Sequence, residues 1–202
     1  LFVAYYRRAL PHFQRVKEMI VQNEFGALTA LNYTFANDTQ RPRKKAFGWR
    51  FDPQIAGGGL FWDIGSHALD LFDYWCGPLT NACGRAKNIS GIGKVEETVT
   101  MCAKLQTGAP LSADWSFVNR ERVDQVVLSF EKAKVRCSVF GAAELCIQES
   151  NGIKRSEDFQ LPVNIQLALI SNVVATLRGE ETALSSGHTA RRTNSIIDTV
   201  TR

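Results

Sequence analysis

Four polar residues recur at helical spacing inside one apolar segment, residues 60–76. They are Asp63, His67, Asp70 and Tyr74, and their separations of four, three and four positions would place them on one helix face. A carboxylate one turn before a histidine can hold the imidazole in one tautomer and raise its basicity, which suits a general base near neutral pH. The alternative is a solvated helix face whose ion pair contributes only a few tenths of a kcal/mol.

Glycines surround this segment. Gly57, Gly58 and Gly59 immediately precede it, so the backbone could turn sharply, approach a ligand closely and leave N–H groups free at a helix N-terminus. Gly65 lies within the helix, where it costs about 1 kcal/mol relative to alanine. We therefore expect the backbone at Gly65 to pack closely against a sheet.

The elements that must position these residues follow from the hydrophobic pattern. Helices are predicted at residues 11–22, 60–76, 164–178 and 187–201. Residues 1–7 and 27–36 are predicted strands, and short β-forming runs separated by turn residues continue from 79 to about 160. A long polar loop, 37–58, precedes the glycines. This order predicts an α+β fold with a mostly antiparallel open sheet and helices packed on one face, in one domain spanning residues 1–202.

Composition limits the classes of partner. The 202 residues carry a formal net charge of +4 with 22% charged residues, which is typical of a globular domain. The charge is spread along the chain, and the basic run at 41–45 has no interleaved aromatic residues, so we expect no nucleic-acid partner. No apolar run approaches the ~20 residues that span a bilayer, so we expect no membrane partner. The first residue is not methionine, and we expect a piece of a longer polypeptide.

The cysteines and histidines argue against a metal site. Five cysteines are dispersed without a C-x-x-C motif, which favours buried free thiols in a reducing compartment, with the cytoplasm as the expected location. Asp63 and His67 could be two metal ligands, but a catalytic zinc normally has three protein ligands and spacing indicates no third. We therefore expect no metal.

The segment GWRFDPQIAGGGLFWDIGSHALDLFDYWCGP resembles the W-R-x-x-P…G-G-G-x-x-x-D-x-G-x-H-x-x-D motif of the glucose–fructose oxidoreductase/inositol dehydrogenase/MocA (Gfo/Idh/MocA) superfamily. The opening VAYYRRALPHFQRVKEMI is similar to the start of that superfamily's C-terminal domain, and the closing SSGHTARRTNSIIDTV is similar to its final helix. The resemblance covers essentially the whole chain and implies a fold like the C-terminal domain of glyceraldehyde-3-phosphate dehydrogenase.

The resemblance also implies an activity. In that superfamily a substrate hydroxyl loses its proton as hydride passes to NAD or NADP, or the reverse reaction occurs. His67 would be the proton acceptor and Asp63 its companion. The candidate contacts to substrate or cofactor are Tyr6, Arg8, Trp49 and Arg50. The implied substrate is a small molecule: a sugar, a polyol or a related cyclic alcohol.

Two features of the family are absent from the sequence. There is no G-x-G-x-x-G turn to cradle a pyrophosphate and no Glu-Lys-Pro motif. We therefore expect this chain to be the substrate-side half of a dehydrogenase, with little or no activity without a Rossmann domain. The open sheet face would pair with a second copy in a homodimer or tetramer. The alternative is a non-catalytic binding or oligomerisation domain of the same fold.

Overall fold

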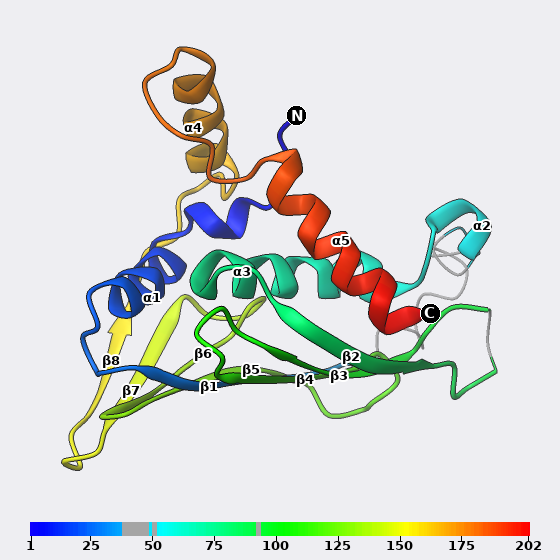
Figure 1. Ribbon diagram of the computed structural model, residues 1–202, viewed down its shortest axis with the longest axis horizontal. Coiled ribbons are helices and arrows are strands. Elements are labelled where there is room, and N and C mark those ends of the chain that lie inside the picture. Colours follow the sequence, from blue (N-terminus) through cyan, green and yellow to red (C-terminus); the bar gives the residue numbers. More distant parts are fainter. Residues whose placement is uncertain (38–48, 50–51, 92–93) are drawn as a thin grey trace.

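A computed structural model describes residues 1–37, 49, 52–91 and 94–202. Their strands form one open sheet in the order β2-β3-β4-β1-β5-β6-β7-β8, with the main helices above one face (Figure 1). The strands are β1 (Leu28–Ala36), β2 (Thr80–Lys87), β3 (Thr98–Lys104), β4 (Pro110–Ser116), β5 (Val123–Phe130), β6 (Ala133–Cys137), β7 (Glu144–Glu149) and β8 (Lys154–Asp158). All neighbours are antiparallel except β1 and β4. The α+β fold class is confirmed.

The helical segments run in the expected order. They are η1 (Tyr6–Ala9), α1 (Pro11–Val21), α2 (Pro53–Ala56), η3 (Phe61–Gly65), α3 (Ser66–Cys76), α4 (Leu167–Leu177) and α5 (Gly187–Thr201). The predicted strand at 1–7 is wrong. Phe2 makes a single bridge to Ser186, and the chain then turns into the 3-10 helix η1. Burial of the apolar residues here comes from packing among helices, which apolar composition alone does not distinguish from a sheet.

The core lies between the sheet and the helices. Alternate residues of the central strands are buried, as in β1, where Leu31 and Tyr33 face the helices and Asn32 faces solvent. From α3, Phe72 meets Tyr33 with ring centroids 5.5 Å apart, and Trp75 is also fully buried. The apolar side of this helix therefore packs on the sheet.

Gly65 is needed for a neighbouring ring. A Cβ at Gly65 would lie 2.3 Å from the ring of Phe61, and that ring contacts Trp115 of β4 with centroids 4.9 Å apart. Phe61 is fully buried, so it has little space to move away. The close packing predicted at Gly65 is correct, but it is made by Phe61, which lies between the helix and the sheet.

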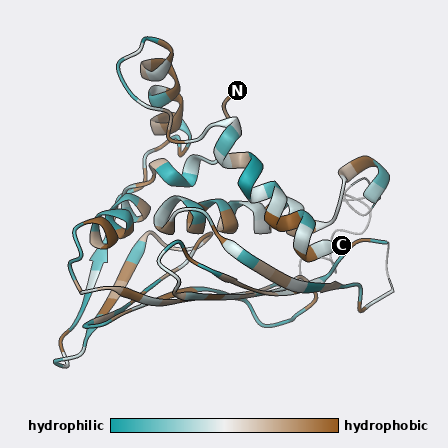
Figure 2. Ribbon diagram, viewed as in Figure 1, coloured by the Kyte–Doolittle hydropathy of each residue, from teal (hydrophilic) through white to brown (hydrophobic). Residues whose placement is uncertain are grey.

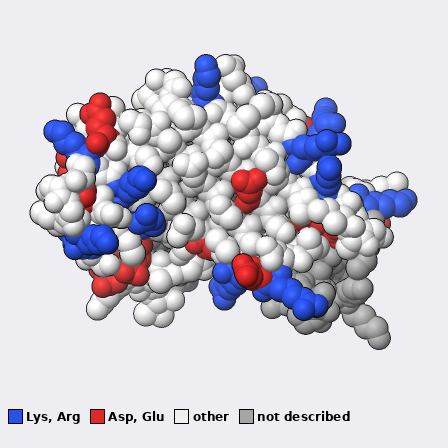
Figure 3. Space-filling view, turned by 90° about the horizontal axis from the view of Figure 1, so that it is seen from below, with Lys and Arg blue, Asp and Glu red and all other residues white. Residues whose placement is uncertain are grey.

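Two surfaces remain uncovered within the described residues. Figure 3 shows the helix-free face of the sheet, where uncharged side chains cover much of the middle. Apolar residues recur along α4, which projects from the body in Figures 1 and 2. Its Leu167, Ile170, Val174 and Leu177 are 42–72% exposed. Throughout the described ranges, each helix is too short or too polar to serve as a bilayer span.

Candidate functional site

His67 is the second residue of α3 and lies against the 3-10 helix η1 and the residue before it. The ring of Tyr5 meets the imidazole edge-on with centroids 5.4 Å apart, and the ring of Tyr6 lies at 6.0 Å. Tyr5 is hydrogen-bonded to Ser66, and the Ser66 hydroxyl donates to the carbonyl of Asp63 at 2.9 Å. The histidine is thus fixed by aromatic contacts from a segment about sixty positions away.

The helix carrying His67 is not a regular α-helix throughout. Phe61–Gly65 form a π-helical turn, which is wider than an α turn and is frequent at functional sites. Asp63 lies in that turn and His67 follows it, so the angular relation expected from a uniform helix does not hold between them.

The helix N-terminus already has an acceptor. The carboxylate of Glu96 accepts hydrogen bonds from the Gly59 N–H at 2.8 and 3.0 Å, and the N–H groups of Phe61 and Trp62 also stabilise its charged form. A Cβ at Gly59 would lie 2.9 Å from the Glu96 carbonyl oxygen, so the glycine permits this approach. The expectation of free N–H groups for a ligand is therefore wrong, because the chain's own carboxylate occupies this position.

The imidazole of His67 is held neutral at pH 7. Its pKa is lowered to about 4, mainly by burial and secondarily by charge repulsion from Arg7, while Asp63 opposes both as a nearby anion. The Nδ1 atom is buried and has no hydrogen-bond partner. As expected from their spacing, Asp63 raises the pKa of His67, but burial outweighs it, so the imidazole is less basic than a free histidine. Nδ1 has no hydrogen-bond partner, so no bond from Asp63 to that atom fixes the tautomer.

Arg7 was not singled out by the sequence. Its guanidinium is buried, donates from Nε to the carbonyl of Val139 at 3.0 Å, and stacks between the rings of Tyr6 and Phe140 at 4.8 and 4.3 Å. A buried cation this close to the imidazole disfavours the imidazolium form. The adjacent arginines at positions 7 and 8 were the available signal, but spacing could not tell which one faces His67.

Arg8 lies further along α3, in a buried ion-pair network. Its guanidinium donates to both carboxylate oxygens of Asp70 at 2.7 Å, and Asp73 is 3.4 Å away. Arg192 of α5 donates to the two oxygens of Asp73 at 2.8 and 2.7 Å. Arg8, expected as a substrate or cofactor contact, instead joins η1, α3 and α5, because its donors are used by buried carboxylates.

The remaining predicted residues are dispersed. Tyr74 donates its hydroxyl to Gln14 at 3.0 Å, and Asp70 is buried, so the expected polar face does not open as one surface. Trp49 is 51% exposed, and Arg50 lies outside the described residues. Tyr6 and Asp63 therefore remain beside His67, whereas Arg8 and Asp70 form a separate network.

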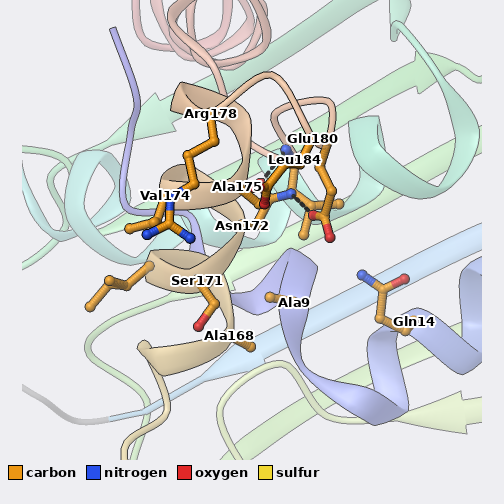
Figure 4. A pocket seen from close by; sticks show the side chains of 12 residues that line it. Ala9, Gln14, Ala168, Ser171, Asn172, Val174, Ala175, Arg178, Glu180 and Leu184 are labelled. Atoms are coloured by element: carbon orange, nitrogen blue, oxygen red, sulfur yellow. Dashed lines mark hydrogen bonds between the residues drawn. The ribbon is translucent and has the colours of Figure 1, made fainter.

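The described residues contain no group of three or more side chains that could bind a metal ion. A concavity of about 660 Å³ lies between α4 and the η1–α1 region (Figure 4). It includes Ala9, Gln14, Ser171 and Arg178, and Asn172 there donates to Glu181 at 2.8 Å. None of the residues beside His67 lines this concavity, so it is separate from the candidate site.

His12 gives a test of how burial acts on histidine in this fold. Burial, and secondarily Arg7, lowers its pKa to about 4, so the unfolded state takes up a proton between about pH 6.5 and 4 that the folded state does not. Stability from this group is complete above the unfolded pKa and is lost as pH falls towards the folded one. Between pH 7 and 5 we expect a loss of about 2 kcal/mol from His12 alone.

The substitution His12→Phe removes this titration and fits the contacts with Phe13 and Phe159. Urea unfolding of both proteins at pH 7 and pH 5 gives the comparison. The variant should lose about 2 kcal/mol less than the wild type over this interval, and an equal loss in both proteins would contradict the assignment.

Comparison with known protein families identifies one that matches this chain. A family model described as the GFO/IDH/MocA C-terminal domain matches residues 13–142. Oxidoreductase P35 of Formosa agariphila is 26% identical over 174 residues, which are 85% of this chain and 53% of that protein. The chain thus spans about half the length of this curated relative.

Two solved structures share the fold. The WlbA dehydrogenase from Bordetella pertussis, in complex with NADH and UDP-GlcNAcA, has a TM-score of 0.78 at 20% identity, covering 99% of this chain and 59% of its own. Levoglucosan dehydrogenase, in complex with NADH and levoglucosan, has a TM-score of 0.80 at 15% identity, covering 98% of this chain and 63% of its own. At these identities the likeness shows a common fold.

Proposed function

Because the chain belongs to the Gfo/Idh/MocA family of C-terminal domains, we propose that it is the substrate-side domain of an NAD(P)-dependent oxidoreductase. The proposed substrate is a sugar, a polyol or a related cyclic alcohol. The observation that carries the proposal is His67, a half-buried imidazole that is neutral at pH 7 and stands on a π-helical turn beside two tyrosine rings. Relatives that bind NADH with a sugar-type ligand support the substrate class.

Proton transfer is assigned to Nε2 of His67. Nδ1 is shielded from solvent, so Nε2 is the nitrogen left for a substrate hydroxyl. In the oxidation direction, the neutral imidazole would accept the hydroxyl proton. The chemistry that a nicotinamide cofactor would supply beside it is acceptance of the hydride. Burial and Arg7 make the resulting imidazolium more acidic than a free one, which favours release of the proton after each turnover. Asp63 stabilises the imidazolium while it exists.

The residues around His67 restrict its position. Tyr5 and Ser66 fix the start of α3, and the Arg8–Asp70 pair fixes the next turn of the helix against η1. We propose that Tyr6, which contacts the imidazole and stacks on Arg7, contributes to the substrate pocket. Arg8 is proposed as a positioning residue.

The chain itself does not fit the phosphates of a dinucleotide. The sequence contains no G-x-G-x-x-G turn, and the Gly59 amide is occupied by Glu96. We therefore propose that a separate nucleotide-binding domain holds the cofactor and presents its nicotinamide to His67. The additional length of the relatives is consistent with such a domain.

Exposed apolar surface is consistent with this partner domain. A groove of about 220 Å³ between α4 and the N-terminal segment is lined by apolar residues such as Phe2, Val3 and Leu169. Contiguous apolar surface of this kind marks an interaction site in soluble proteins. We propose that the nucleotide-binding domain covers it, and that the helix-free sheet face pairs with a second copy.

The test uses a full-length protein that contains this domain. NADH and NADPH are titrated by fluorescence, and oxidation of a panel of sugars, polyols and cyclic alcohols is followed by nicotinamide absorbance. We expect saturable binding of at least one cofactor and turnover of at least one substrate. Failure to bind either cofactor would reject the oxidoreductase and favour a non-catalytic binding domain.

A further inference from the structure

Two cysteines face each other at one edge of the sheet. Cys83 of β2 and Cys102 of β3 are directly opposite in the antiparallel ladder, and their Sγ atoms are 3.0 Å apart. Directly opposed residues in such a ladder have Cα atoms about 4.5–5.5 Å apart, within the ~4.4–6.8 Å that a disulfide spans. The backbone is therefore already arranged for a covalent bond between these side chains.

Both thiols are accessible in the single chain. The two side chains are exposed, and they lie on the helix-free face, since Met101 and Ala103 on either side of Cys102 point into the core. Pairing of this face with a second copy, as proposed above, would protect both thiols, so the reaction belongs to the unpaired chain. The expectation that the cysteines are buried holds for Cys76 and Cys137 but is wrong for the other three. The third exposed cysteine is Cys146, whose Sγ lies 3.8 Å from the hydroxyl oxygen of Ser156 and not beside a second thiol.

We propose that Cys83 and Cys102 form a redox modification site at which hydrogen peroxide converts two thiols into an intrachain disulfide. In the first step the Cys83 thiolate attacks a peroxide oxygen, an S–O bond forms, the O–O bond breaks, and the departing hydroxide is protonated to water. In the second step Cys102 loses its proton and attacks the oxidised sulfur. The S–S bond forms as the S–O bond breaks, which releases a second water molecule.

The roles of the two thiols follow from their contact. The two sulfur atoms are in contact, and either can donate the hydrogen bond between them; this contact raises the pKa of the Cys102 thiol. Cys102 therefore suits the second, resolving step, in which it needs only to reach a sulfur that is already adjacent.

The disulfide would fix the edge of the sheet beneath α5. β2 is the outer strand, and a Cβ at Gly84 would lie 2.8 Å from Val200 of α5, so this helix rests directly on the strand. The bond would close a loop over residues 84–101, which restricts the unfolded chain more than the folded one. We expect the oxidised protein to melt roughly 5–10 °C higher than the reduced protein.

The experiment treats the purified, reduced protein with a small excess of hydrogen peroxide, alkylates the remaining thiols and digests with trypsin. We expect the loss of two hydrogens per chain and a link between peptides 51–85 and 95–104. Cys76 shares the first peptide with Cys83, so the variant Cys83→Ser identifies which sulfur is bonded. Both Cys83→Ser and Cys102→Ser should abolish the link and the rise in Tm.

Cys146→Ser is the matched control, because it removes an exposed thiol from the same sheet face without touching the pair. That variant should form the link and show the full rise in Tm. Oxidation of single thiols to sulfenic or sulfinic acid without a link would overturn the proposal. So would a link that appears only between chains on a non-reducing gel, or one that survives Cys83→Ser.

Discussion

Replacing His67 by asparagine in the enzyme that contains this domain is expected to lower kcat for alcohol oxidation by roughly 10²–10⁴-fold, because the substrate hydroxyl loses its proton acceptor. The fold should be retained. The Nδ1 atom makes no hydrogen bond, so the substitution breaks none there, and we expect Tm to change by no more than about 3 °C. Steady-state kinetics and thermal unfolding of the same preparation separate the two effects.

His12 provides the control for this result. It is a second buried histidine whose pKa is also about 4, but it packs against Phe13 and Phe159 and does not contact the rings around His67. His12→Phe should therefore leave kcat within about twofold of the wild type. Wild-type turnover in the His67→Asn enzyme would exclude His67 as the base, even if cofactor binding and the overall activity were established.

Replacing Arg8 by methionine is expected to lower the free energy of unfolding by about 3–5 kcal/mol. Asp70 is buried, with 1% of its surface exposed. The substitution removes the guanidinium that donates to both oxygens of this carboxylate. In a domain of this size the loss corresponds to a fall in Tm of roughly 6–20 °C. Chemical denaturation at pH 8 measures it directly.

The same variant should be less impaired at acidic pH. Burial already raises the pKa of Asp70 to about 6 with Arg8 present, and removing the cation raises it further. The folded variant therefore binds a proton that the unfolded chain binds only at lower pH, and stability from this group is present at low pH and lost as pH rises. The deficit at pH 5 should be smaller than at pH 8.

Two further variants test whether the loss of stability in Arg8→Met comes from the buried ion pair. Asp198→Asn removes an exposed ion pair with Arg202 and should cost less than about 0.5 kcal/mol. Arg8→Met combined with Asp70→Leu removes both buried charges and should recover much of the loss. A loss below about 1 kcal/mol for Arg8→Met would show that the network does not hold η1 against α3.

Local patterns were sufficient for much of the architecture. Apolar residues alternate in β3 and β4 and recur at helical spacing in α3, and these are the side chains that face the core. Every second residue of a strand meets the same surface, as do residues one turn, or about 3.6 positions, apart in a helix. The prediction of a strand at residues 1–7 was wrong for a related reason. Apolar and aromatic residues at 1–7 are buried in either a strand or a packed 3-10 turn, and composition does not separate the two.

The candidate site was predicted less completely than the fold. The sequence drew attention to His67 and to the glycines before it, and it associated Asp63 with the histidine through their spacing. It did not reveal Tyr5, Arg7 or Glu96, because their relation to His67 depends on how η1 and the loop before β3 lie against the helix. It also assigned Arg8 to the substrate side.

The sequence alone determined which side chains were available and which would share a face of a helix or strand, since these follow from the chain's own periodicity. Only the tertiary structure decided the protonation state of His67 and the occupant of the helix N-terminus. It also decided which arginine met which carboxylate. Each depends on burial and on charges brought together from distant segments, and the balance of desolvation against Coulomb attraction cannot be evaluated until those segments are packed.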